Sequence, residues 1–429
     1  MSRCTTNKEA WKILFEKYNI LEEINKNGYF EITSKQINDY REARLMTKFD
    51  NSSQLPELFK KNNLAILPIT RNSYMIAKFD TYAKFEPNNS EIIKVEFPPH
   101  IQSLDYNNIT SEALAINSAY ITKILEDFLE EQELFPTISG KMKSGDFEFK
   151  INNIEDKENS INVLVHDSRI EIDGGYEGIN SLALIEAKNV ISDDFMVRQL
   201  YYPYRLWKSK ISKTIRPIYI VYSNGIFNVY EYKFDDDSDY SSLKLVKAKR
   251  YSIEDTEIEL KDIENIFNNI NKFKEEPEVP FPQADTFSRV INLCELLEDS
   301  TKTKNEITQN YAFDQRQTNY YTDAARYLGL VEKSRIDGQI TFDLTEKGRK
   351  LLKLKYKQRQ LEFVKLILEH EAFHDYLRLY FLRADKPSTL DTIEIMQHCN
   401  LYNLDKESTY KRRASTIRGW VEWILDLTR

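Results

Sequence analysis

The sequence predicts a multidomain α+β fold, and three observations support this prediction. The chain has 429 residues, which is enough for roughly two to four domains with ample hydrophobic cores. Its 26 Tyr and 23 Phe, against 11 Gly and 12 Pro, indicate folded segments rather than disorder. Apolar residues alternate as in strands in some segments and recur at helical spacing in others. We therefore expect a sheet-containing part and helix-rich parts along one chain.

Composition also limits the setting in which the chain works. We find no apolar run long enough to cross a bilayer and no signal-peptide pattern at the start, so we expect a soluble, cytoplasmic protein without a membrane partner. Cys4, Cys294 and Cys399 are far apart, which fits free thiols in a reducing compartment. The net charge of −8 argues against a nucleic-acid partner, but residues 285–429 carry +2 and residues 1–284 carry −10. A C-terminal DNA-binding part is compatible with this distribution.

Residues 1–109 are expected to form an N-terminal α+β region. Apolar spacing over 10–18 and 21–24 predicts a helix, followed by a helix at 55–59 and two strands at 63–69 and 74–77. Two roles stay open for this region. It packs on the following domain, or it contacts DNA through four basic residues, Arg41, Arg44, Lys48 and Arg71.

The next region, 110–274, begins with an amphipathic helix over 110–133, followed by a strand at 147–151. Glu126 and Glu130 on this helix are candidates for an accessory role in a site. The alternative is that they belong to a solvated helix face.

This region centres on two segments, 162–173 and 182–188, in which apolar and polar residues alternate as they do in strands. Gly174, Gly175 and Gly178 supply the freedom to reverse the chain between them, so that Asp173 comes to lie beside Glu186. Side chains two residues apart in a strand share a face, which places Lys188 next to Glu186 and Glu171 one pleat behind Asp173.

Two carboxylates held a few ångströms apart repel each other unless a cation lies between them. Oxygen ligands of this kind suit Mg²⁺ or Mn²⁺, and a neighbouring lysine can orient or deprotonate a metal-bound water. The alternative is that Glu186 and Lys188 form a solvated strand end.

After this hairpin, Ser192, Asp193 and Asp194 are expected to cap a helix running toward Lys210. A strand at 218–222, a turn at 223–225, a strand at 227–234 and a helix around 258–273 complete the region.

The region resembles the PD-(D/E)xK nuclease superfamily in two respects. It has an Asp, a short hairpin and then Glu-x-Lys at the end of an apolar strand, and its elements follow the order helix, three strands, helix, strand. The resemblance implies an α/β nuclease core at 110–274, with Asp173 and Glu186 as metal ligands for Mg²⁺ (Mn²⁺ substituting) and Lys188 as the catalytic lysine. It also implies an accessory role for Gln199 in holding the scissile phosphate, although Pro203 stands where one branch carries Tyr. The passage 44–71 is similar to the N-terminal part of some type II restriction endonucleases.

A linker at 275–284 is expected from three prolines and several charges. The pattern of residues 285–357 predicts three helices and a hairpin that turns at Asp337-Gly338. This arrangement is similar to winged-helix domains. A domain of this kind binds DNA or, alternatively, protein. The outer face of its third helix offers DNA-binding candidates for base edges and phosphates, namely Arg316, Gln317, Asn319 and Tyr320.

Residues 358–429 are expected to form a second winged-helix-like domain without a clear wing. The pattern predicts a long helix over 362–381, a Ser388-capped helix through Cys399 and a last helix around 408–425. The basic face of this last helix suits phosphate contact through Lys411, Arg412, Ser415 and Arg418.

A competing motif lies in the same region. His370-Glu371-Ala372-Phe373-His374 matches HExxH, which on a helix can place two imidazoles on one face for Zn²⁺. Leu377 stands where metzincins carry Gly, and Glu394 is the one candidate for a third ligand. The alternative is that both histidines serve packing.

Taken together, the resemblance implies a type II restriction endonuclease that makes sequence-specific, Mg²⁺-dependent cuts in double-stranded DNA. A homodimer, at least on DNA, and a cognate DNA methyltransferase in the same system follow from it as expected partners. The alternatives are a structure-specific repair nuclease and a DNA-binding regulator with an inactive nuclease fold.

Overall fold

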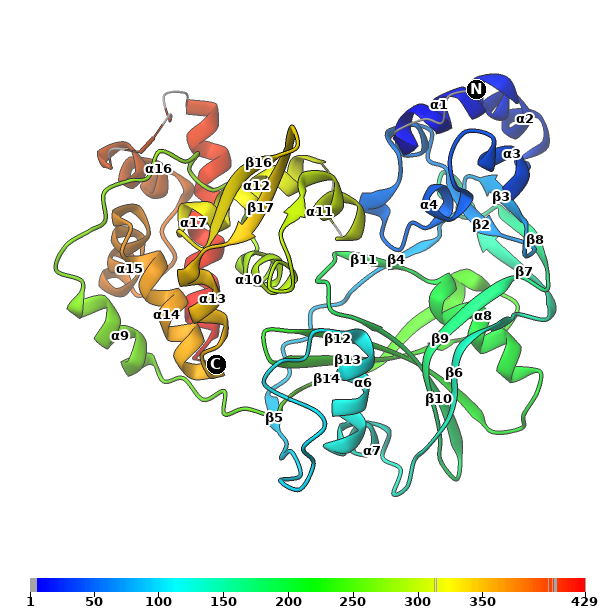
Figure 1. Cartoon of the computed structure of the whole chain (residues 1–429), viewed down its shortest axis with the longest axis horizontal. Coiled ribbons are helices and arrows are strands. Elements are labelled where there is room, and N and C mark those ends of the chain that lie inside the picture. The colour runs from blue at the N-terminus through cyan, green and yellow to red at the C-terminus, as the bar shows by residue number, and fades with distance from the viewer. Residues whose placement is uncertain are drawn as a thin grey trace.

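The computed structural model describes residues 6–311, 313, 315–399, 401–402, 404 and 407–428. It is a mixed α/β structure in which a small N-terminal unit lies above a sheet-containing core, and a mostly helical C-terminal unit lies beside both (Figure 1). No helix in these ranges is both long and apolar enough to span a membrane.

The N-terminal unit packs five helices around a three-stranded sheet of order β1-β3-β2 within the described residues. Trp11 is fully buried at its centre, and its indole N–H donates to the carbonyl of Met46 at 3.0 Å. The helix expected over 10–18 and 21–24 is two helices separated at Asn19, which has a left-handed φ of 47°, whereas the helix expected at 55–59 and both predicted strands are confirmed. Its elements are α1 (Asn7–Lys17), α2 (Ile20–Asn27), β1 (Tyr29–Thr33), α3 (Ser34–Asn38), α4 (Ala43–Thr47), η1 (Ser52–Gln54), α5 (Glu57–Lys61), β2 (Ala65–Pro68) and β3 (Ser73–Ala77).

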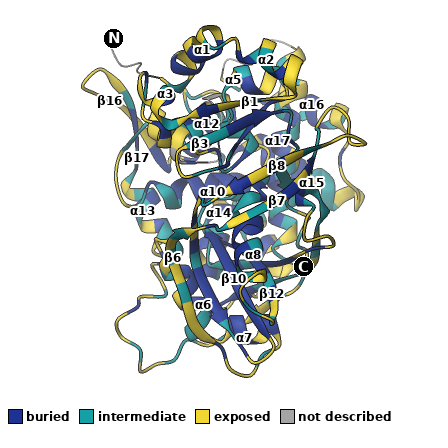
Figure 2. Ribbon diagram, turned by 90° about the vertical axis from the view of Figure 1, so that its right-hand side faces the viewer, coloured by how far each residue is buried: buried dark blue, intermediate teal, exposed yellow. Residues whose placement is uncertain are grey.

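The core is built on a mixed sheet whose order, among the described residues, is β5-β14-β13-β12-β10-β9-β6. The strands are β5 (Ile92–Lys94), β6 (Phe135–Lys143), β9 (Arg169–Glu177), β10 (Ser181–Lys188), β12 (Thr214–Ser223), β13 (Ile226–Phe234) and β14 (Leu243–Ser252). The helices α6 (Glu112–Ile121) and α7 (Ile124–Leu129) share one hydrophobic cluster with the sheet, and α8 (Arg198–Lys208) shares another. Strands β10 and β12 are therefore buried along most of their length (Figure 2).

Strand β10 shows why this sheet forms. Leu182 and Leu184 belong to the cluster that contains α8, whereas Ala183, Ile185 and Ala187 belong to the cluster that contains α6 and α7. A strand that is apolar on both faces favours a central place between two helical layers. Its pairing with β12 is parallel and its pairing with β9 is antiparallel.

Several expectations for the core need correction. The helix expected over 110–133 is broken at Lys123, which has a left-handed φ of 63°. The expected first strand, β7 (Asp146–Asn152), lies outside the main sheet and pairs with β8 (Ser160–His166). The run 162–173 is thus two strands, β8 and β9, separated by a turn at Asp167 (φ 48°).

The glycines of the central hairpin also act differently from the prediction. Gly174 and Gly175 lie within β9, and the chain reverses after Glu177. A Cβ on Gly175 would come within 2.7 Å of Ile138 Cβ in β6. The glycine is therefore needed for a close approach of two strands rather than for a turn.

The segment 192–194 does not cap the next helix. Asp194 begins the short strand β11 (Asp194–Met196), which pairs with β4 (Tyr82–Lys84), and α8 begins at Arg198. The Asp194 carboxylate accepts the backbone N–H of Ser52 at 2.9 Å and also the Ser52 hydroxyl, so it ties the core to the N-terminal unit.

The first part of the C-terminal unit confirms three predicted helices and a hairpin. Asp337 and Gly338, with φ of 48° and 78°, form the predicted turn of the hairpin. The elements are α10 (Phe287–Leu296), β15 (Lys302–Thr303), α11 (Lys304–Asn310), α12 (Gln315–Tyr327), β16 (Val331–Ile336) and β17 (Gln339–Leu344), with strand order β15-β17-β16.

The second part contains only helices among its described residues: α13 (Glu346–Leu352), α14 (Tyr356–Leu368), α15 (Glu371–Arg383), α16 (Thr389–His398) and α17 (Glu407–Asp426). The long helix expected over 362–381 is two helices, because His370 adopts an extended conformation (φ −96°, ψ 124°) and begins the second helix. Ser388 caps α16 as predicted. Buried residues from 258 to 424 form one continuous cluster, so the two expected C-terminal domains share a single core.

The segment expected to be a linker is packed rather than extended into solvent. Phe281 and Ala284 are buried, and the Trp420 indole N–H donates to the Ala284 carbonyl at 2.6 Å. The preceding helix α9 (Leu260–Asn269) buries Ile263 in the same C-terminal cluster. The core and the C-terminal unit are therefore joined through a folded segment.

Lys347 in α13 gives a pH-dependent stability prediction. Burial and the neighbouring Lys274 lower the pKa of Lys347 from 10.5 to about 8. Because the unfolded chain then binds more protons than the folded chain between about pH 8 and 10.5, stability should rise with pH across that window. We expect Lys347→Met to be more stable than the wild type at pH 7, by a margin that shrinks steadily as the pH rises toward 10.5, as measured by urea denaturation. A difference that stays constant from pH 7 to pH 10.5 would contradict this assignment.

Candidate active site

The end of the β9–β10 hairpin gathers the three residues expected from the sequence. Extending the register, in which Ile185 pairs with Gly174, places Glu186 opposite Asp173. Asp173 Oδ2 accepts the backbone N–H of Ala187 at 3.0 Å, and Lys188 Nζ lies 2.5 Å from Glu186 Oε1. Lys188 also donates to the Ala187 carbonyl at 3.0 Å, so adjacent residues of one strand hold its ammonium in place.

Gln199 in the first turn of α8 also joins this group, and the phosphate-holding role that the family resemblance implies for it stays a prediction. Its Nε2 donates to Glu186 Oε1 at 2.5 Å. Its Oε1 is buried and has no hydrogen-bond partner within the described structure. A buried amide oxygen without a donor is costly unless something binds it, so this atom is available to a ligand or a cation.

Two further acidic residues, Glu112 and Asp50, belong to the site and were not predicted. Glu112 opens α6, which Ser111 caps, and its Oε1 lies 3.5 Å from Lys188 Nζ. Asp50 of the N-terminal unit acts electrostatically on both Glu186 and Lys188, and its carboxylate lies 3.4 Å from Lys48 Nζ. Glu112 follows Ser111, a residue type that often begins a helix, and this signal could have placed Glu112 at a helix start. Asp50 is far away in the sequence, and no local pattern marks it.

The electrostatics of the site are dominated by burial. Burial raises the pKa of Glu186 to about 8, an effect that Asp173 and Asp50 reinforce and Lys188 opposes. Burial likewise raises the pKa of Glu112. For Lys188, burial favours the neutral amine, but Glu186, Tyr219 and the other acids outweigh it and hold the pKa well above its usual range. The site therefore favours positive charge.

The donor set fits a hard divalent cation. Asp173 and Glu186 supply carboxylate oxygens, and the unpaired amide oxygen of Gln199 lies on the residue bonded to Glu186. Oxygen donors of this type suit Mg²⁺ or Mn²⁺ better than Zn²⁺, which more often binds His and Cys. In the described part of the chain, no three His, Cys, Asp or Glu side chains are grouped as a metal cage, so the amide oxygen and solvent would complete the coordination.

The other accessory candidates pair with lysines that do not belong to this group. Glu126 pairs with Lys123 at 2.7 Å, and Glu130 at the end of α7 pairs with Lys247 at 2.5 Å. Glu171 is exposed and lies 3.5 Å from Lys141 on β6. Each of these three carboxylates is therefore paired with a lysine outside the candidate site, and an accessory role for them stays a prediction.

The two histidines of the HExxH motif contact different parts of the chain. The His370 ring stacks on Tyr327, with centroids 4.2 Å apart, and its Nδ1 lies 3.1 Å from Glu276. The His374 ring stacks on Phe267 at 4.1 Å, and its Nε2 lies 3.3 Å from the Phe267 carbonyl. Because the helix begins only after His370, the motif does not present both rings on one helical face.

The expected DNA-contacting residues lie on two helices of the C-terminal unit. On α12, Arg316 and Asn319 are exposed, whereas Gln317 and Tyr320 are half-buried. The α17 candidates comprise three exposed residues, Lys411, Arg412 and Arg418, and the half-buried Ser415. Among these, Lys411 pairs with Glu407 at 3.1 Å.

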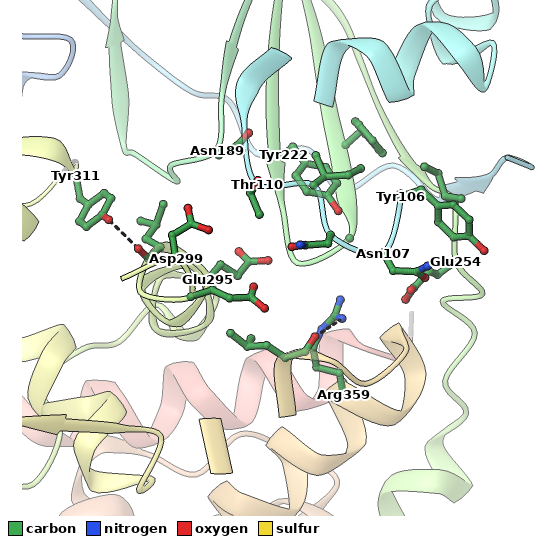
Figure 3. A pocket seen from close by; sticks show the side chains of 18 of the residues that line it. Tyr106, Asn107, Thr110, Asn189, Tyr222, Glu254, Glu295, Asp299, Tyr311 and Arg359 are labelled. Carbon is green, nitrogen blue, oxygen red and sulfur yellow. Dashed lines mark hydrogen bonds between the residues drawn. The ribbon is translucent and has the colours of Figure 1, made fainter. Parts of the chain in front are cut away.

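A polar network joins the core to α10 directly behind Lys188. Asn292 donates to the carbonyl of Asn189 at 2.8 Å and accepts the N–H of Ile191 at 3.0 Å. Beside it, Glu295 accepts the hydroxyl of Ser223 at 2.6 Å. A hollow of about 190 Å³ lies at this junction and is lined by Tyr106, Glu295 and Arg359, among others (Figure 3). The loop after Lys188 is thereby fixed by the C-terminal unit.

Comparison with protein-family models finds three that match this chain. The models cover consecutive parts of the chain and are described as Domain of unknown function (DUF6996) at 8–76, Domain of unknown function (DUF6997) at 77–252 and Domain of unknown function (DUF7226) at 289–429. No curated protein and no solved structure matches the chain. The candidate site at Asp173, Glu186 and Lys188 falls within the middle model, and Asp50 falls within the first.

Proposed function

We propose that this chain is an endonuclease that cuts double-stranded DNA with Mg²⁺, in the manner of a type II restriction enzyme. The observation that carries the proposal is the group formed by Asp173, Glu186 and Lys188 at one end of a buried strand pair, with Gln199 bonded to it. Two carboxylates and a lysine in this arrangement are suited to metal-assisted phosphodiester hydrolysis.

The arrangement of the core supports the proposal. Helix α6 precedes β6, β9 and β10, and α8 follows on the opposite face before the parallel strand β12, which is the order expected of a PD-(D/E)xK core. The three helices and hairpin of residues 287–344 resemble a winged helix, which favours a DNA partner. A homodimer on DNA and a cognate methyltransferase are further expectations of the same proposal.

The mechanism follows from the contacts of the site. Asp173, Glu186 and the Gln199 amide oxygen would hold Mg²⁺, which when bound supplies Lewis-acid stabilisation of the phosphate and a more acidic water. Gln199 fixes one oxygen of Glu186 and so orients the carboxylate. Lys188 keeps its proton because its pKa is held well above the usual range, so it acts as a positively charged donor that positions water and stabilises charge on phosphate. Glu112 helps to keep that ammonium in place.

The test is incubation of the full-length protein with plasmid and phage DNA in Mg²⁺ or Mn²⁺. We expect discrete, reproducible fragments, no cleavage after removal of Mg²⁺, and no loss of activity with a zinc chelator or in His374→Ala. Cleavage of branched DNA alone would assign a repair nuclease instead, and tight binding without cleavage would assign a regulator. Loss of activity on zinc removal and in His374→Ala together would replace this proposal with a zinc enzyme.

A further inference from the structure

A second hollow lies between the N-terminal and C-terminal units. It has a volume of about 860 Å³. One side is formed by α1, α4, α5 and the segment between α4 and α5, and the other side by α11 and the start of α12. A hydrogen bond from Gln54 Nε2 to the Gln309 carbonyl, 3.5 Å long, links the two sides. We call this hollow the inter-unit cleft.

The lining of the inter-unit cleft is basic although the chain is acidic. Only two acids, Asp50 and Glu57, contribute to it within the described residues, whereas the net charge of the whole chain is −8. The basic residues that line it come from both sides and are Lys8, Arg41, Arg44, Lys48, Lys60 and Arg316. Lys8 pairs with Glu57 and Lys48 pairs with Asp50, so the lining keeps an excess of positive charge, and such an excess in a hollow attracts a polyanion.

Asp50 connects the inter-unit cleft with the candidate active site. Asp50 lines the cleft and also raises the pKa of the buried Glu186, and Lys48 lies 3.4 Å from Asp50. At the other side the lining includes Arg316, in the first turn of the helix whose exposed face carries the predicted base-reading residues. One ligand in the cleft would therefore reach both the candidate active site and the exposed face of α12.

We propose that the inter-unit cleft binds the phosphate backbone of the DNA duplex that the candidate site cuts, so that the N-terminal unit and α12 hold one duplex from two sides. This inference rests on the proposed function. A duplex presents one negative charge per about 1.7 Å of its axis, which matches a row of basic side chains better than an isolated phosphate does. Guanidinium groups such as that of Arg44 bind phosphate oxygens in pairs. The cleft is lined by Asp50, which is linked to the candidate site, and by Arg316, on the helix with the predicted base-reading residues. Because DNA is the expected ligand of both places, DNA is favoured over an acidic protein segment.

The test compares two neutralising substitutions inside the cleft with two outside it. Arg44→Gln/Lys60→Gln removes two exposed charges of the lining. Lys12→Gln/Lys26→Gln, on α1 and α2, makes the same change of net charge at exposed positions that do not line the cleft. Binding of each full-length variant to a 30-base-pair duplex is measured by fluorescence anisotropy against salt concentration. EDTA is present so that no cutting occurs.

We expect the cleft variant to bind more weakly and the slope of log Kd against log salt to fall by about 2, since each lost phosphate contact lowers it by about 0.9. The outer variant should keep the slope of the wild type. Equal slopes in both variants would overturn the cleft assignment, even if the wild type cuts plasmid DNA in Mg²⁺. A wild type that binds polyglutamate and not the duplex would assign the cleft to an acidic protein segment instead. The proposed function is decided separately, by plasmid cleavage with the wild type.

Discussion

Glu186→Gln and Asp173→Asn should each lower DNA cleavage by at least about a hundredfold while leaving duplex binding unchanged. Each substitution keeps the size of the side chain and removes a negative charge from the place where a cation is expected. Neither carboxylate fills the hydrophobic core, so both variants should fold. The measurements are initial rates of plasmid cleavage in Mg²⁺, with circular dichroism and anisotropy as checks on folding and binding.

Lys188→Ala should also lose cleavage, but its response to metal should differ. Mn²⁺ coordinates oxygen ligands more readily than Mg²⁺ and should partly restore the carboxylate variants, whereas it cannot replace an ammonium group. Glu171→Gln is the matched control, because Glu171 lies on the same strand as Asp173 yet is exposed and paired with Lys141. An inactive Glu171→Gln beside an active Asp173→Asn would show that the first acid of the site has been assigned wrongly.

The central part of the site could be predicted because it depends on local geometry. Strand alternation places Glu186 and Lys188 on one face, and antiparallel pairing with the preceding strand brings Asp173 opposite Glu186. Gln199 was predicted through the family resemblance, and the structure places it against Glu186. These relations involve residues within about one supersecondary unit.

Asp50 and the placement of Glu126 show where sequence reasoning fails. Asp50 reaches the site because the Asp194 carboxylate accepts hydrogen bonds from Ser52, and a contact across 142 positions leaves no periodic signal. Glu126 is only a candidate from the sequence, with a solvated helix face as the alternative, and the left-handed Lys123 breaks the helix that was expected to carry it. Backbone breaks without Gly or Pro, here and at His370, depend on tertiary packing and are not visible in local propensity.

The same limit applies to the glycines. Gly175 was interpreted as a turn residue, whereas the structure requires it for the approach of β6 to β9. Gly419 within α17 is a second example, because local rules give it no role in a helix. An ideal Cβ at Gly419 would lie 2.2 Å from the carbonyl oxygen of Asp285 and 3.1 Å from its carbonyl carbon. The neighbouring Trp420 indole donates to the Ala284 carbonyl in the same contact.

Gly419→Ala should therefore destabilise the protein, although the same change in a solvent-exposed helix stabilises it by about 1 kcal/mol. The added methyl group must push α17 away from the segment at 284–285, and overpacking of this kind costs about 1–3 kcal/mol. We expect the free energy of unfolding, measured by urea denaturation, to fall by that amount. Ser408→Ala, an exposed position of the same helix, is the control and should stay within about 0.5 kcal/mol of the wild type. An increase in stability for Gly419→Ala would mean that α17 does not pack against residues 284–285 in solution.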